Sequence, residues 1–282
     1  KPIQVIEYDR IPPTKNQNVC KLLEDSILVY AIFVDVDIYH PWTEFDVKTT
    51  MDSLNKATQW LQSQAVSFNK SVTFSNVQHL QNGKWTINEN KAITSLRLNG
   101  LVERNGKIGS SLKKLNPWAE SIARYAGKGL KYKPSSKMAT RFKILDKETL
   151  MLALRDKYKH ENIALLFFVN GFYENHPSYT FFSATNGPEV EYSIITTKNP
   201  AVISHEILHL FGAVDLYPTM DFPNFNYKKL EKAHPNEVMR IQHKQLEKLN
   251  ISPITGYFIG WQDTLDHENE NMLLHKKTLI EY

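Results

Sequence analysis

Cysteine is almost absent from this chain, because Cys20 is the single cysteine among 282 residues. One thiol cannot form an intramolecular disulfide, and it excludes a zinc module built from several cysteines. Long hydrophobic runs are also missing. The two longest, residues 27–34 and 163–169, are far shorter than the roughly 18 residues that a membrane helix needs, so we expect no membrane span. The composition, 41% hydrophobic and 23% charged, is typical of a globular protein and excludes wholesale disorder.

Charge is small overall but unevenly placed. The net charge is +4, yet residues 103–143 hold eleven Lys and Arg against two acidic residues. This basic segment also carries Trp118, Tyr125 and Tyr132, and such a mixture can bind a polyanion through counterion release and stacking. No nucleic-acid-binding motif accompanies it. We therefore interpret it as a solvated basic insertion and expect no nucleic-acid partner.

Hydrophobic periodicity predicts alternating strands and helices. Apolar residues recur at helical spacing in residues 47–66, and Asp146 is a candidate N-cap for a second amphipathic helix. Asn186-Gly187 predicts the turn of a hairpin, and Asn199-Pro200 is typical of a helix start. Short apolar runs rich in β-branched and aromatic residues predict strands at residues 27–36, 71–77, 92–98, 163–169, 178–184 and 190–197.

This order of elements favours an α/β or α+β class with a mixed sheet. The length fits a single domain over residues 1–282. Within it we distinguish an N-terminal extension (1–26), the basic insertion (103–143) and a C-terminal subdomain (216–282).

The pattern His-Glu-x-x-His at residues 205–209 carries the clearest chemistry. Residues four apart lie one above the other on an α-helix, so His205 and His209 can bind one metal ion. Glu206 lies beside them, about 100° around the helix, where it can reach a water molecule at the metal. The same helix carries apolar residues that can pack into the core.

Gly212 follows three residues after His209 and can end the helix, because glycine adopts a positive φ without steric cost. The resulting turn could return Asp215 to the same metal. Two imidazoles and one carboxylate leave a position for water, as in a catalytic zinc site, with Glu206 as general base. The full pattern arises by chance in only about 4 of 100,000 such chains, so we favour it over a core helix with hydrogen-bonded histidines.

Residues 205–215 resemble the metzincin clan of zinc metallopeptidases, in the variant whose third ligand is aspartate, and are similar to the snapalysin-type bacterial enzymes. The resemblance covers residues 163–261. It implies a mixed five-stranded sheet with an antiparallel edge strand, residues 178–182, along which an extended peptide could lie. It also implies a C-terminal helix, for which Ser252-Pro253 is a suitable start.

The clan pattern further includes a methionine in a tight turn beneath the metal. Met239 is the candidate for this structural position, and Met220 is the competing one. Some metzincins have a tyrosine two residues after the methionine, but Ile241 stands there, so no tyrosine role carries over. Tyr217 and Tyr257 are the candidate substitutes.

Two further alternatives stay open. In the gluzincin clan the third ligand is a glutamate on a later helix, and Glu231 and Glu237 lie at workable separations. Gly212 favours Asp215 instead, because a continuing helix disfavours glycine. Cys20 could supply an N-terminal thiolate that blocks the metal, as in matrix metalloproteinases, although no clear motif surrounds it.

The sequence thus predicts a monomeric zinc-dependent endopeptidase that acts on a protein or peptide substrate. His205, His209 and Asp215 would bind Zn²⁺, and Glu206 would be the catalytic base. One alternative is a non-catalytic zinc-containing protein that binds through residues 103–143. Another is a zinc amidase acting on a cell-wall peptide, whose site chemistry would be identical.

Overall fold

The computed structural model describes residues 23–35, 41–80, 83–88, 112–130, 146–169, 178–181, 190–218, 225–241 and 245–273. Several predicted features lie outside these ranges, namely Cys20, Met220, the strand at 92–98 and the Asn186-Gly187 turn.

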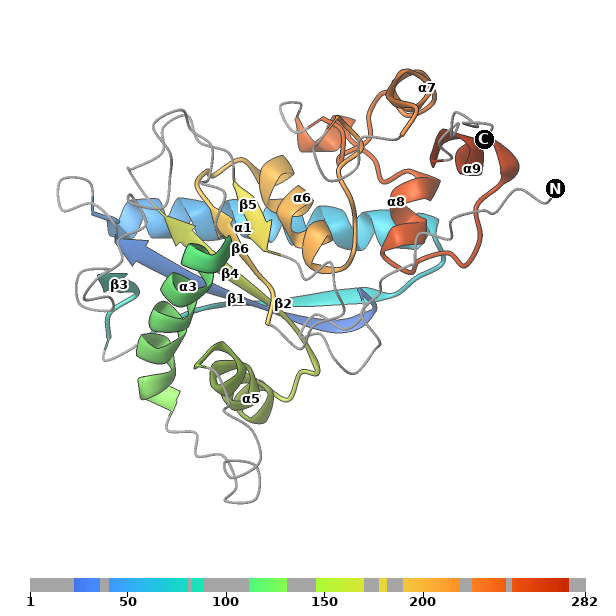
Figure 1. The fold of residues 1–282 in the computed structure, drawn as a ribbon. Coiled ribbons are helices and arrows are strands. Elements are labelled where there is room, and N and C mark those ends of the chain that lie inside the picture. Colours follow the sequence, from blue (N-terminus) through green and yellow to red (C-terminus); the bar gives the residue numbers. More distant parts are fainter. Residues whose placement is uncertain are drawn as a thin grey trace, which may run out of the picture.

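A long strand, β1 (Asp25–Asp35), lies inside the sheet and pairs with three other strands (Figure 1). It runs parallel to β2 (Val72–Gln78), to the short β3 (Thr86–Asn88) and to β4 (Asn162–Val169). Next to β4 lies the parallel strand β6 (Tyr192–Ile195), and β5 (Tyr179–Phe181) pairs with β6 in the antiparallel direction. The order is therefore β2-β1-β4-β6-β5, with β5 at one edge and β3 paired to the far end of β1.

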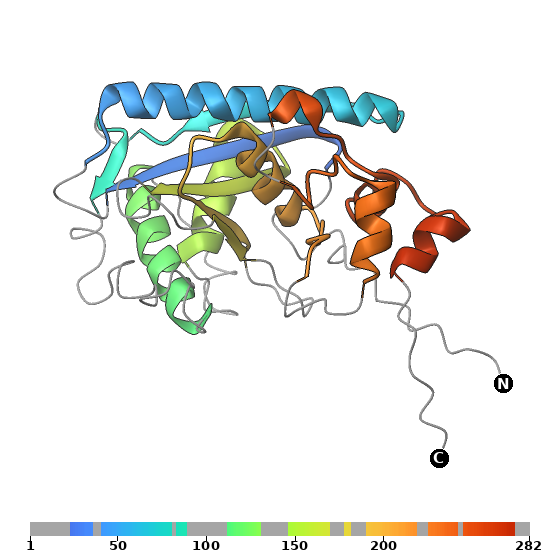
Figure 2. The same cartoon turned by 90° about the horizontal axis from the view of Figure 1, so that it is seen from above.

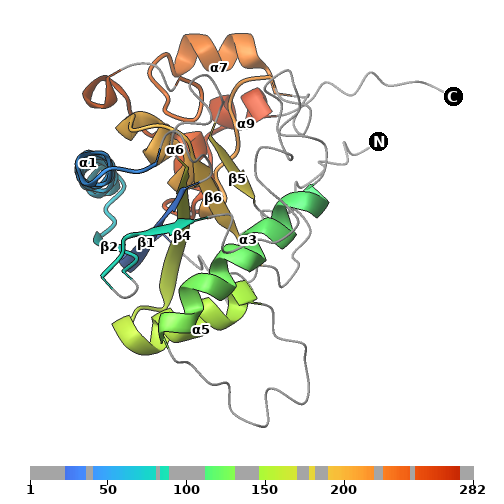
Figure 3. The same cartoon turned by 90° about the vertical axis from the view of Figure 1, so that its left-hand side faces the viewer.

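Helices cover both faces of this sheet (Figures 2 and 3). One face packs against α1 (Glu44–Ser67) and α6 (Pro200–Leu210), and the other packs against α3 (Leu112–Gly127) and α5 (Asp146–Tyr158). Strand β1 is buried on both sides, so its residues alternate between two cores. Ile27, Val29, Ala31 and Phe33 join the α1 and α6 side, and Leu28, Tyr30, Ile32 and Val34 join the other.

Local sequence accounts for where these helices begin. Thr43 and Asp46 form a capping box at the start of α1, with each side chain bonded to the other residue's backbone N–H. Beyond α6 the chain forms α7 (Tyr227–Ala233), α8 (Pro253–Phe258), α9 (His267–Leu273) and two short 3-10 turns, η2 (Lys128–Leu130) and η3 (Leu246–Lys248). None of the helices in the described ranges has both the length and the apolarity of a membrane span.

The predicted α+β class, with a mixed sheet and an antiparallel edge strand, is confirmed. The sheet has six strands and not five, because β3 adds a short parallel strand beside β1. Within the described residues the edge strand is Tyr179–Phe181, which lies inside the predicted range 178–182. Ser252 does cap the predicted C-terminal helix, since its hydroxyl accepts from the Thr255 N–H at 3.3 Å.

The structure describes residues 112–130 of the basic segment, and this part is not solvated on all sides as its charge suggested. Its helix α3 contributes Leu115, Trp118, Ile122 and Ala126 to the core, and all four are buried. These residues recur at helical spacing, so the helix is amphipathic.

A lysine is buried where α5 meets α3 and the sheet. Lys147 is only 2% exposed, and its Nζ donates to Asn116 Oδ1 at 2.9 Å and to the Val190 carbonyl at 3.0 Å. Glu120 Oε1 lies 3.5 Å from the same nitrogen, and the centroid of the Tyr192 ring lies 4.7 Å away. One cation therefore ties α5 to α3 and to the segment that leads into β6.

Replacing Lys147 with Met should lower the free energy of unfolding by about 3 kcal/mol, because Glu120 and Asn116 lose a buried partner. Urea denaturation would measure this loss. Lys159→Met is the matched control, since the Lys159 side chain is 77% exposed and its ion pair with Asp156 should contribute almost nothing. Equal effects of the two substitutions would contradict the account.

Candidate metal centre

Helix α6 carries both histidines of the predicted site. Asn199 caps its start by accepting from the Ala201 N–H at 2.9 Å, with Pro200 as the first helical residue. His205 and His209 are both buried, one turn apart, and their Nε2 atoms are 3.0 Å apart. The two rings thus converge on one point, as the sequence predicted.

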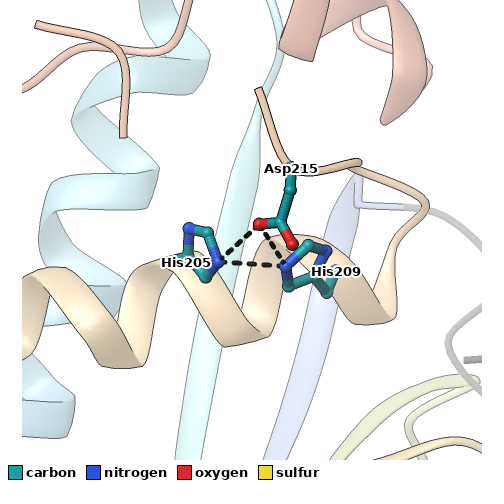
Figure 4. A group of neighbouring side chains, drawn as sticks. All are labelled: His205, His209 and Asp215. Carbon is teal, nitrogen blue, oxygen red and sulfur yellow. Dashed lines mark hydrogen bonds and ion pairs between the residues drawn. The ribbon is translucent and has the colours of Figure 1, made fainter. Parts of the chain in front are cut away.

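A glycine turn returns the chain to this point. Gly212 has a φ of 102°, and its N–H donates to the His209 carbonyl at 3.1 Å, which ends the helix. Asp215 follows, and its Oδ1 lies 3.1 Å from His205 Nε2 and 3.2 Å from His209 Nε2 (Figure 4). The structure therefore brings together all three predicted ligands.

Backbone carbonyls fix the orientation of both rings. His205 Nδ1 lies 3.2 Å from the Val238 carbonyl, and His209 Nδ1 lies 2.8 Å from the Ala213 carbonyl. We assign the Nδ1–H tautomer to each neutral ring, because a carbonyl can only accept. Each Nε2 then carries a lone pair that points toward Asp215. Two lone pairs and a carboxylate oxygen at this distance suit a positive charge between them, supplied either by a metal ion or by a proton on one of the rings.

The spacing of these atoms fits a metal ion. The three donor atoms are 3.0–3.2 Å apart, and two ligands of a tetrahedral zinc ion lie about 3.3 Å apart. Asp215 Oδ1 is buried and accepts no hydrogen bond of normal geometry within the described part of the chain. The cluster could therefore bind a metal ion. Zinc is among the divalent transition metals that accept two imidazoles and a carboxylate.

The close contacts in this cluster shift the pKa values of Asp215 and His209. Burial alone would raise the pKa of Asp215, but the two neighbouring imidazoles lower it well below its usual value. Burial likewise opposes the protonation of His209, yet the nearby Asp215 carboxylate outweighs it and raises the pKa of His209 to about 9. The metal-free protein therefore carries a proton on His209 at neutral pH.

Metal binding should release this proton. A histidine must be neutral to act as a ligand, so binding at pH 7 should release about one proton from His209 per metal ion. This contribution from His209 should disappear above the pKa of about 9, where His209 has already lost the proton. The ¹⁵N resonances of the His209 imidazole should titrate near pH 9 in the metal-free protein and should not titrate in the zinc-loaded protein. A His209 ring that is already neutral in the metal-free protein at pH 7 would contradict the assignment.

The turn at residues 236–241 supports the site from outside α6. The Val238 carbonyl holds His205, and the Met239 carbonyl accepts from the Leu216 N–H at 3.0 Å, next to Asp215. The Met239 side chain is fully buried in the same core as α6. The turn that contains Met239 therefore contacts both the first histidine and the segment of the third ligand.

Glu237 organises this turn and is not a ligand. Its buried carboxylate accepts from the Met239 N–H at 3.1 Å, from the Thr255 hydroxyl at 3.0 Å and from the Ser252 N–H. Burial raises the pKa of Glu237 although these hydrogen bonds favour the charged form. The other candidate, Glu231, is 69% exposed and pairs with Arg240. Neither glutamate belongs to the metal cluster.

The predicted base, Glu206, is buried on the helix face toward the sheet edge. Its side chain is 3% exposed, and its Oε2 accepts from the Thr180 hydroxyl at 2.6 Å. Thr180 belongs to the edge strand β5, and sequence reasoning did not single it out. The only sequence signal for Thr180 was that a residue with a hydroxyl group lies on one face of a short predicted strand.

The two candidate tyrosines lie in different places. The Tyr217 ring stacks near the His205 ring, with centroids 6.4 Å apart and an interplanar angle of 17°. Tyr257 lies in α8, where its ring packs edge-on against Phe258. Of the two, Tyr217 is the one placed beside the metal cluster.

No protein-family model matches the chain, and no curated protein sequence matches it. The class of the protein therefore rests on its fold and its site alone. It is an α+β protein with a mixed sheet, and its His205, His209 and Asp215 could bind a metal ion.

Proposed function

We propose that the protein is a zinc-dependent endopeptidase of the metzincin type. The observation that carries the proposal is the convergence of His205, His209 and Asp215, with the Glu206 carboxylate on the same helix. Two imidazoles and one carboxylate leave a coordination position for water, which a purely structural zinc site would fill with a fourth side chain.

His205, His209 and Asp215 would hold the zinc ion. When bound, zinc would polarise the scissile carbonyl and make a water molecule acidic near neutral pH. Glu206 would accept a proton from the attacking water and deliver it to the departing amine nitrogen. The Val238 and Ala213 carbonyls would keep both rings in the tautomer that ligation needs.

The edge strand gives a place for the substrate. Strand β5 is antiparallel to β6 and ends the sheet order, so no other described strand pairs with its outer side. It contacts α6, the helix that carries two of the three candidate ligands. An extended peptide could pair with this strand, which favours a protein or peptide substrate cleaved within its chain.

A cleavage assay on zinc-loaded protein tests this function. We expect internal cleavage of some members of a mixed peptide library, loss of cleavage after metal chelation, and recovery when Zn²⁺ is restored. Cell-wall peptides belong in the same assay, because exclusive cleavage of their amides would favour the amidase alternative. Zinc binding without cleavage of any substrate would favour a non-catalytic binding protein and defeat the proposal.

A further inference from the structure

The environment of Glu206 assigns a role to a residue of the edge strand. Thr180 and Ser193 lie directly opposite each other in the antiparallel β5–β6 pair, on the face of the sheet that α6 covers. Figure 3 shows α6 beside these two strands. Both side chains are buried, at 3% and 0% exposure. Two buried hydroxyls therefore meet the helix at the position of Glu206.

The Thr180 hydroxyl has one proton and three oxygen neighbours. Its Oγ1 lies 2.6 Å from Glu206 Oε2, 2.7 Å from Ser193 Oγ and 3.0 Å from the Glu206 carbonyl. A hydroxyl donates preferentially to a carboxylate, and 2.6 Å is the distance of a charge-assisted O–H···O⁻ bond. Thr180 therefore donates to Oε2.

Ser193 completes the arrangement. Its Oγ lies 2.7 Å from Thr180 Oγ1 but 3.3 Å from the Glu206 carbonyl, so Thr180 is its better acceptor. The chain of donors then runs from Ser193 to Thr180 to Glu206. This series of hydrogen bonds fixes Oε2 of Glu206. The other carboxylate oxygen, Oε1, is the one left to exchange a proton with water.

We propose that Thr180 is a positioning residue for Glu206, which holds the carboxylate in one rotamer and couples it to the strand that would bind the substrate. This inference rests on the proposed peptidase function. Because β5 carries Thr180, the hydrogen bond from Thr180 would hold the Glu206 carboxylate at a fixed position relative to a peptide paired with β5. A small misplacement of a catalytic group is enough to slow the chemical step about 100-fold.

Three variants separate positioning from a structural role. Thr180→Val removes the hydroxyl and keeps the branched shape, whereas Thr180→Ser keeps the hydroxyl. Ser178→Ala is the matched control, since Ser178 lies two residues earlier on the same face and its Oγ accepts from the Thr196 N–H at 3.1 Å. All three are measured in the zinc-loaded full chain, with kcat and KM determined separately.

Thr180→Val should lower kcat about 10- to 100-fold and change KM less than about twofold, as is common when a supporting hydrogen bond is removed. Thr180→Ser should restore kcat to within about threefold of the wild type, and Ser178→Ala should stay within about twofold. Zinc content should remain that of the wild type in each variant.

A second readout does not depend on turnover. In protein labelled with ¹³C at the glutamate carboxyls, the Glu206 resonance is identified by its loss in Glu206→Gln. It should shift in Thr180→Val, return toward its original position in Thr180→Ser, and stay unchanged in Ser178→Ala. This measurement reports the hydrogen bond itself.

Four outcomes would overturn the inference and leave the proposed function standing. Two concern activity: a fully active Thr180→Val variant beside an active wild type, or an equal loss of kcat in Ser178→Ala. The other two are a Glu206 resonance that does not move in Thr180→Val, and loss of zinc from Thr180→Val. A wild type that binds zinc and cleaves nothing would overturn the proposed function, and the catalytic role of Thr180 with it.

Discussion

Replacing Glu206 with Gln should lower kcat for peptide hydrolysis about 1,000-fold or more, because the amide cannot take the proton from the attacking water. The substitution suits the site, since the amide oxygen can still accept from the Thr180 hydroxyl that now donates to Oε2 at 2.6 Å. Zinc content should stay at the wild-type level, because Glu206 is outside the group of ligands. Steady-state kinetics on a peptide substrate would measure the loss.

The zinc content of the Glu206→Gln protein is the control for this prediction. If zinc were lost together with activity, the substitution would have disturbed α6 and the result would say nothing about a base. Retained activity in a zinc-loaded Glu206→Gln protein would contradict the mechanism directly.

Replacing Asp215 with Ala should weaken zinc binding by at least about 100-fold, since even the residues behind metal ligands commonly contribute 10- to 100-fold. Asp215 supplies the only negative charge among the three ligands and lies 3.1–3.2 Å from both nitrogens. Its removal should also lower the pKa of His209, because burial then acts without the opposing carboxylate. Competition titrations with a zinc chelator of known affinity would measure the loss.

Glu231→Ala is the matched control, because the gluzincin alternative assigns Glu231 as a third ligand. Its exposed side chain pairs only with Arg240 among the contacts described, so zinc affinity should not change. The opposite pattern, with unchanged affinity in Asp215→Ala and lost affinity in Glu231→Ala, would transfer the ligand to the glutamate.

The three ligands could be predicted from the sequence because their arrangement is local. His205 and His209 are related by one helical turn, and Gly212 marks the reversal that returns Asp215. Seven residues thus determine the geometry from His209 to Asp215, and no distant segment has to be placed first. The Asn199-Pro200 start of the helix could be read in the same way.

The supporting residues could not be predicted because their contacts are distant in sequence. Thr180 reaches Glu206 only through the register of β5 on β6 and the position of α6 over the sheet. Glu237 accepts from the Ser252 N–H fifteen residues later, and nothing local distinguishes a buried glutamate from an exposed one. Such contacts depend on tertiary packing, which no short pattern encodes.

Two differences between the predicted and the observed fold have causes that lie in the local sequence. The apolar stripe of α3 has helical spacing, but the surrounding positive charge suggested a solvated segment. Strand β3, at Thr86–Asn88, is too short to give a periodic signal. For α3, local composition was a weaker guide than the need to cover a face of the sheet.

The metal content of the purified wild-type protein tests the central claim most directly. Elemental mass spectrometry after dialysis against zinc at neutral pH should find about one zinc ion per chain, in line with the single cluster of two imidazoles and one carboxylate among the described residues. Absence of bound metal after zinc has been supplied would contradict the account. In that case His205 and His209 would be core residues of α6, and neither the proposed chemistry nor the role of Thr180 would stand.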